Sequence, residues 1–171
     1  LYKLDKDLLL TKVDKNYRIT NGPAFIDKLN FYHTDSSKKI IYKIKINQKD
    51  KIISKKIFKR FSSKDGSPDG MTLDKNKNLW VAHFHGACVS VFNNRAKLIH
   101  RINLPAKNIT NCAFGGQNNS EIFITSATKG MNSRDLQKYQ CSGFLFSVKT
   151  NVRGFLQKKF ILNNEAKRSL L

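Results

Sequence analysis

Short apolar segments separated by polar turns recur along the chain, and few are long enough for a helix. In segment 40–46, IIYKIKI, the isoleucines at positions 44 and 46 alternate with lysines at 43 and 45, which is the period of a strand with one buried face. Asn, Asp, Gly and Ser, the residues that favour turns, lie between the segments. Because helix patterns are nearly absent, the sequence predicts an all-β protein.

Three parts of the chain repeat one order of strands and turns. Each part opens with a polar residue, at Asn21, Asp69 and Asn111. A short first strand, a polar turn, a second strand with bulky residues and a third strand then follow. The expected first strands are 24–25, 71–73 and 113–114, the second strands 31–32, 79–81 and 122–124, and the third strands 40–46, 88–93 and 143–148. Four short antiparallel strands in roughly 40–50 residues is the size of one β-propeller blade.

The repeat predicts about three propeller blades within residues 1–163. Propellers close with about 4–8 blades, so three blades would make an incomplete ring. Residues 1–20 are expected to supply the two outer strands of a preceding blade. We therefore expect 1–163 to be the C-terminal part of a single propeller domain in an N-terminally truncated fragment, and 164–171 to be an unstructured tail. A β-sandwich whose hairpins resemble one another by chance is the alternative.

Asn21 and Asp69 are the candidate ligands of a cation. Both are expected to precede the innermost strand of adjacent blades, and innermost strands converge on the central channel of a propeller. Carboxylate and amide oxygens suit hard divalent cations. A simple turn role is the alternative, because Asp-Gly is a common turn dipeptide. His83 and His85, two positions apart, could face one side of a strand and bind metal, but no third ligand accompanies them.

The net charge of +20 raises the question of a nucleic-acid partner. The lysines are scattered, however, and those of 43–61 fall largely at exposed strand positions, where they resist edge-to-edge pairing. No nucleic-acid-binding motif and no apolar run of about 20 residues is visible. Three widely spaced cysteines indicate a reducing compartment. The composition thus predicts a cytoplasmic protein without a specific nucleic-acid partner or a membrane partner.

Five motifs carry a resemblance to a known family. They are TNGPAF at 20–25, SPDGMTLDKNKNLWVAHFHGACVSVFN at 67–93, LPAKNITNCAFGG at 104–116, EIFITSATKGM at 121–131 and SGFLFSV at 142–148. In this order and at these intervals the chain resembles the regucalcin (senescence marker protein), gluconolactonase and luciferin-regenerating-enzyme-like propellers over about residues 1–162. The resemblance implies a six-bladed β-propeller of about twice this length.

The resemblance also implies a site and a reaction. One divalent cation (Ca²⁺, Zn²⁺, Mn²⁺ or Mg²⁺) would be held by Asn21, Asp69 and a Glu of the N-terminal blades that this chain lacks. Asp69 would also act as the general base. The residues that bind the substrate are expected mainly in those same blades, and the family varies around Asn111, which receives no role. The implied function is a metal-dependent sugar-lactone hydrolase with a sugar lactone as its small-molecule partner. A non-catalytic calcium-binding regulatory propeller is the alternative.

Overall fold

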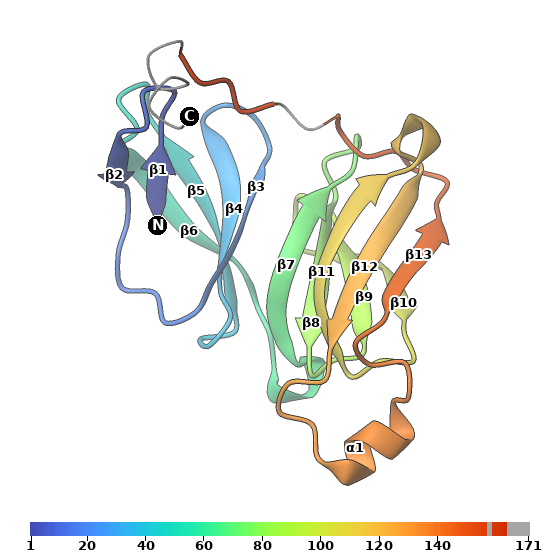
Figure 1. The fold of residues 1–171 in the computed structure, drawn as a ribbon. Coiled ribbons are helices and arrows are strands. Elements are labelled where there is room, and N and C mark those ends of the chain that lie inside the picture. The colour runs from blue at the N-terminus through green and yellow to red at the C-terminus, as the bar shows by residue number, and fades with distance from the viewer. Residues whose placement is uncertain (157–158, 164–171) are drawn as a thin grey trace.

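The computed structural model describes residues 1–156 and 159–163, and this part of the chain is built from antiparallel sheets (Figure 1). The all-β prediction is confirmed. The first sheet contains β1 (Tyr2–Leu4) and β2 (Leu10–Lys12). The second contains β3 (Thr20–Phe25), β4 (Asn30–Asp35), β5 (Ile40–Ile46) and β6 (Ile52–Arg60). The third contains β7 (Ser67–Leu73), β8 (Leu79–Phe84), β9 (Cys88–Phe92) and β10 (Leu98–Asn103). The fourth contains β11 (Asn108–Gly115), β12 (Glu121–Ala127) and β13 (Leu145–Lys149).

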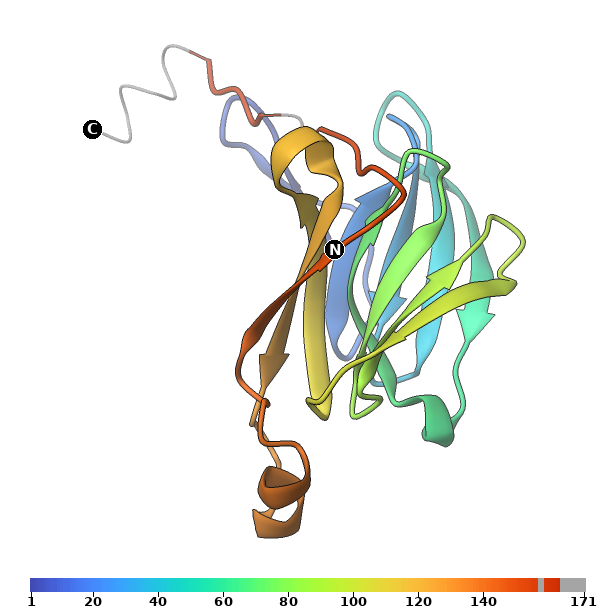
Figure 2. The ribbon, with the colours of Figure 1, turned by 90° about the vertical axis from the view of Figure 1, so that its right-hand side faces the viewer.

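The last three sheets are meanders in which strands adjacent in sequence pair with one another. Their first strands, β3, β7 and β11, are edge strands, and β7 contacts both β3 and β11 (Figure 1). The first strands of three successive sheets therefore lie side by side. Figure 2 shows the sheet β11–β12–β13 packed beside the sheet β7–β10.

The first strands begin earlier than the sequence predicted. We expected Asn21 and Asp69 to precede their strands, but they lie inside β3 and β7, and Asn111 lies inside β11. Pairing with the next strand shifts register between Asn21 and Ala24, between Pro68 and Met71, and between Ile109 and Asn111. An irregularity of this kind lets a ladder continue past a residue that does not fit its alternation and re-aims the side chain there. The expectation was wrong because the hydrogen-bonded ladder of each strand begins at polar residues, before the apolar pattern starts.

The second and third strands lie close to the predicted positions, with one addition before the last strand. The short helix α1 (Ser133–Lys138) and two 3₁₀ turns, at Ser63–Asp65 and Gln117–Asn119, were not predicted. Asn132 caps α1 by accepting a hydrogen bond from the Asp135 N–H, and the Lys107 ammonium pairs with the Asp135 carboxylate. Local capping explains a short helix within a strand-rich sequence. Among the described residues, no helix is both long and apolar enough to cross a membrane.

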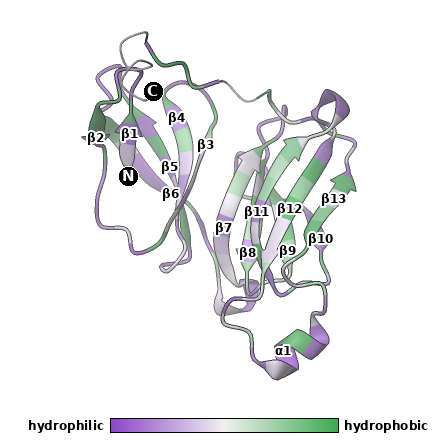
Figure 3. Ribbon diagram, in the orientation of Figure 1, coloured by the Kyte–Doolittle hydropathy of each residue, from purple (hydrophilic) through white to green (hydrophobic). Residues whose placement is uncertain are grey.

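The hydrophobic core lies between the sheets and shows why LWVA in β8 is apolar at every position. Leu79 and Val81 pack toward the second sheet with Tyr32 and Ile41. Trp80 and Ala82 pack in the opposite direction, toward β11 and β12. Both faces of the third sheet are thus covered, so each alternation of β8 is buried. Figure 3 shows how the hydrophobic positions gather on the strands.

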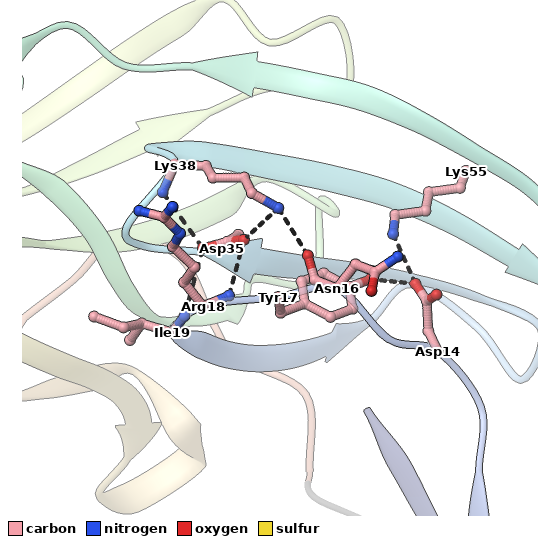
Figure 4. Close-up of polar contacts among 8 residues, drawn as sticks. All are labelled: Asp14, Asn16, Tyr17, Arg18, Ile19, Asp35, Lys38 and Lys55. Atoms are coloured by element: carbon pink, nitrogen blue, oxygen red, sulfur yellow. Dashed lines mark hydrogen bonds and ion pairs between the residues drawn. The ribbon is translucent and has the colours of Figure 1, made fainter.

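The N-terminal segment is attached to the second sheet by a polar network (Figure 4). The buried carboxylate of Asp35, at the end of β4, accepts a hydrogen bond from the Arg18 N–H and pairs with the Lys38 ammonium. Asp14 pairs with Lys55 of β6. The side chain of Asp14 and the backbone of Arg18 therefore attach the N-terminal segment to β6 and β4.

Candidate functional site

A cavity of about 480 Å³ lies where the three first strands run together. Three strands supply its lining: Asn21, Gly22 and Pro23 from β3, Asp69, Gly70 and Met71 from β7, and Thr110 and Asn111 from β11. The structure thus brings Asn21 and Asp69 to one cavity, although they are far apart in sequence. It adds Asn111, to which no role was assigned from the sequence.

Two glycines allow the strands to approach one another at this cavity. A Cβ on Gly70 would lie 2.1 Å from Oδ1 of Asn111, so the side chain of Asn111 rests on the Gly70 backbone. Gly22 has φ +90°, a conformation that favours glycine, and a Cβ there would lie 2.7 Å from the Met71 Cε. The NG and DG dipeptides are therefore needed for packing between neighbouring sheets as well as for local backbone shape.

The side-chain amide of Asn21 is oriented by the strand next to it. Its Nδ2 donates a hydrogen bond to Oγ of Ser36 at 2.9 Å. Within the described part of the chain, no hydrogen bond engages Oδ1 of Asn21. The residue therefore offers the cavity a neutral oxygen with free lone pairs, which is a suitable ligand for a hard cation.

Asp69 lies half-buried in the same cavity without a cationic partner among the described residues. Burial raises the pKa of its carboxyl to about 6, and the Gly70 N–H, which favours the charged form, offsets part of that shift. A carboxylate that is half-buried without a countercharge is destabilised. A cation at this position would remove that cost, so the Asn21 oxygen and the Asp69 carboxylate fit a divalent ion.

Asn111 presents the opposite end of its amide. Its Oδ1 accepts a hydrogen bond from the Cys112 N–H at 2.9 Å. In the described residues, its Nδ2 donates to no protein acceptor. The neighbouring hydroxyl of Thr110 is engaged with that of Thr125 at 2.7 Å. The repeat in the sequence placed Asn111 in phase with Asn21 and Asp69, but only the folded chain shows that it lines the same cavity.

The two histidines proposed as a pair do not form one. His83 is buried in β8, and its Nδ1 lies 2.7 Å from the Asp65 carbonyl oxygen. His85 follows the end of β8 with φ +64°, and its backbone N–H donates to Oδ1 of Asn108. The strand ends at Phe84, so the alternation that would place both rings on one side is broken. Among the described residues, no group of three or more His, Cys, Asp or Glu side chains is positioned to hold a metal.

The three first strands also line a larger, more apolar cavity of about 870 Å³. It shares Pro23, Met71 and Asn111 with the first cavity and continues past Leu73 and Phe114. The polar groups of Asn21 and Asp69 line only the smaller cavity. Polar ligands and apolar walls therefore lie next to each other along the same strands.

Comparison with known proteins identifies the family of this chain. A family model described as the SMP-30/Gluconolactonase/LRE-like region matches residues 1–128. The chain belongs to the SMP-30/gluconolactonase/LRE-like family. Regucalcin of Danio rerio is 31% identical to it over 151 residues, covering 86% of this chain and 51% of that protein. Pentonolactonase XacC of Haloferax volcanii is 30% identical over 129 residues, covering 74% and 44%.

Solved structures of the SMP-30/gluconolactonase/LRE-like family share the fold. A luciferin-regenerating enzyme superposes with a TM-score of 0.85 at 28% identity, covering 94% of this chain and 55% of the other. Among the sequence relatives, a protein of Bacillus subtilis provisionally named a sugar lactone lactonase is 34% identical over 158 residues, covering 91% of this chain and 54% of that protein. The chain thus spans about half the length of the relatives that it matches.

Proposed function

We propose that this chain carries part of the active site of a metal-dependent sugar-lactone hydrolase of the gluconolactonase type. The supporting observation is that Oδ1 of Asn21 and the carboxylate of Asp69 share one cavity while neither is engaged by another side chain of the described residues. Lactonases are among the relatives of the family. The substrate is accordingly a sugar lactone, and the whole propeller is six-bladed, of which this chain supplies about three blades.

Asn21 and Asp69 would hold one divalent cation, for which Ca²⁺, Zn²⁺, Mn²⁺ and Mg²⁺ are the candidates. Two oxygen donors of different charge suit such an ion, and the uncompensated carboxylate of Asp69 supplies the electrostatic reason for binding it. When bound, the cation contributes Lewis-acid polarisation of a carbonyl oxygen.

Asp69 would act as the general base. Its carboxylate accepts a proton from the water whose oxygen forms the new bond to the lactone carbonyl carbon. The same proton then goes to the ring oxygen as the bond between that oxygen and the carbonyl carbon breaks, which leaves a hydroxy acid. Burial raises the pKa of Asp69 to about 6 in the metal-free protein, and a bound cation would lower that pKa again because it favours the carboxylate.

The test is lactone opening by the full-length protein after chelation and re-addition of each of the four cations. Activity should disappear with the chelator, return with at least one cation, and be lost in Asp69→Ala. Asp50→Ala is the matched control, because Asp50 makes only a partly exposed ion pair with Lys3. Normal turnover in Asp69→Ala rejects the mechanism, and cation binding without any turnover favours the calcium-binding regulatory alternative.

A further inference from the structure

Two asparagines line the polar cavity, and other groups of the protein form hydrogen bonds with opposite ends of their side-chain amides. The NH₂ group of Asn21 donates a hydrogen bond to Ser36, so the amide oxygen is left as an acceptor for a ligand. The amide oxygen of Asn111 accepts a hydrogen bond from the Cys112 N–H, so the NH₂ group is left as a donor for a ligand. Residues of one type at similar places in β3 and β11 therefore offer complementary chemistry to the same space.

The orientation of the Asn111 amide follows from its surroundings. Rotation by 180° would place the NH₂ group against the Cys112 N–H, so one hydrogen bond would be lost and two donors would face each other. The amide also rests on the backbone of Gly70, where a Cβ would lie 2.4 Å from the Asn111 Cγ. The register shift of β11 between Ile109 and Asn111 accompanies this placement.

A free amide NH₂ cannot ligate a cation, but it can donate to an oxygen atom of a ligand. Asn111 lies against Gly70, the residue that follows Asp69, and all three residues line the polar cavity. Sugar lactones carry acceptor oxygens in their hydroxyl, carbonyl and ring positions. The hydroxyl of Thr110 shares a hydrogen bond with that of Thr125, in which either oxygen can be the donor.

We propose that Asn111 is a substrate-binding residue that donates a hydrogen bond from Nδ2 to an oxygen of the lactone, while Asn21 serves the cation. This inference rests on the proposed lactonase function and extends it to a residue outside the metal ligand set. It predicts that the two asparagines separate in their effects: Asn21 governs metal affinity, and Asn111 governs substrate affinity.

The test measures both affinities in the full-length protein, with Mn²⁺ and glucono-1,5-lactone as probes. Calorimetric titration gives the Kd of Mn²⁺, and initial rates at saturating Mn²⁺ give KM and kcat. Asn111→Ala should raise KM about 5–10-fold with kcat within about twofold and the Kd of Mn²⁺ within about twofold. Asn21→Ala should weaken Mn²⁺ binding instead.

Asn111→Asp provides a second variant of nearly the same shape. It keeps an acceptor for the Cys112 N–H and so retains the local structure, but it replaces the free NH₂ with a second acceptor. Its KM should rise at least as much as that of Asn111→Ala, without weaker Mn²⁺ binding. Asn103→Ala, on the exposed end of β10, is the control that should change neither value.

The outcomes separate this inference from the proposed function. Turnover by the wild-type protein with an unchanged KM in Asn111→Ala overturns the inference alone. Mn²⁺ binding that weakens as much in Asn111→Ala as in Asn21→Ala also overturns it, because Asn111 would then belong to the metal ligands. Absence of turnover in the wild-type protein with every cation rejects the lactonase proposal, and the inference falls with it.

Discussion

The two ends of β7 carry two aspartates in contrasting environments. Asp74, directly after the strand, is 1% exposed, and its carboxylate accepts hydrogen bonds from the Asn78 N–H, the Asn78 side chain and the Trp80 indole. Asp69, near the start of the strand, is half-buried and has no donor from another side chain among the described residues. The number of donors that the fold supplies therefore distinguishes a structural carboxylate from one that remains available to a ligand.

The turn after the first strand of the preceding sheet repeats the structural case. Asp27 accepts hydrogen bonds from the backbone N–H groups of Leu29 and Asn30 and from the Asn30 side chain. Asp27 and Asp74 thus close equivalent turns between first and second strands. Asp69, which precedes Gly70, lies inside a strand, so the Asp-Gly turn considered from the sequence is absent there.

The largest expected effect is on metal binding at the Asp69 end. Asp69→Asn removes the charge but keeps the size of the side chain, so Mn²⁺ affinity should fall by at least about 100-fold. Folding should be preserved, because no described side-chain partner is lost. Calorimetric titration together with circular dichroism checks both statements. Asp74→Asn, the matching change at the other end, should leave Mn²⁺ affinity within about twofold in the folded fraction.

The largest effect on stability is expected at the Asp74 end. Asp74→Ala would leave the Trp80 indole N–H and the Asn78 groups without their acceptor in a buried place, which should lower the free energy of unfolding by about 3 kcal/mol. Urea unfolding followed by the fluorescence of Trp80, the single tryptophan, measures this loss. A loss below about 0.5 kcal/mol would contradict the structural role assigned to Asp74.

Gly70→Ala should affect both the stability of the protein and the KM for lactone, because it acts on the contact between β7 and β11. The new Cβ would lie 2.1 Å from Oδ1 and 2.8 Å from Cα of Asn111, so the two strands must separate. We expect about 1–3 kcal/mol of destabilisation and a several-fold rise in the KM for lactone. Gly130→Ala is the control: its Cβ meets open space, so only its positive φ should cost stability, about 1 kcal/mol.

The smallest effect concerns the pH dependence of stability in the metal-free protein. The pKa of Asp69 is higher in the folded state, about 6, than its ordinary value of 3.8. The folded state therefore binds more protons between these values, and the contribution of Asp69 to stability falls as the pH rises from about 4 to 6. Asp69→Asn should be more stable than the wild-type protein by about 1 kcal/mol at pH 7, after allowance for partial solvent screening, and nearly equal to it at pH 3.5.

Urea unfolding of both proteins in a chelator at several pH values gives this difference. The pH dependence of this difference also distinguishes the contribution of Asp69 to stability from that of the histidines. Burial lowers the pKa of His33 to about 4, so the contribution of His33 to the stability of the protein decreases as the pH falls below 6.5, the ordinary pKa of histidine. This loss is common to both proteins and cancels in the comparison. A difference that does not change with pH would contradict the raised pKa of Asp69.

Much of the strand order was predictable because it depends on local properties. Alternation in IIYKIKI and the apolar run LWVA located β5 and β8, and turn residues located the breaks between strands. Strand starts were predicted less well, because β3, β7 and β11 continue through polar residues by shifting register. The pairing of His83 with His85 failed for a similar reason, since a turn with positive φ at His85 ends the alternation.

The sequence by itself determined the strand-and-turn repeat and the chemical types at Asn21 and Asp69, because these depend on residues close together in the chain. Only the tertiary structure placed β7 between β3 and β11 and so brought Asn111 to the same cavity. It also decided which amide group each asparagine leaves free and how far burial shifts the pKa of Asp69. Those properties depend on partners from other strands and on exclusion of water, which no local pattern specifies.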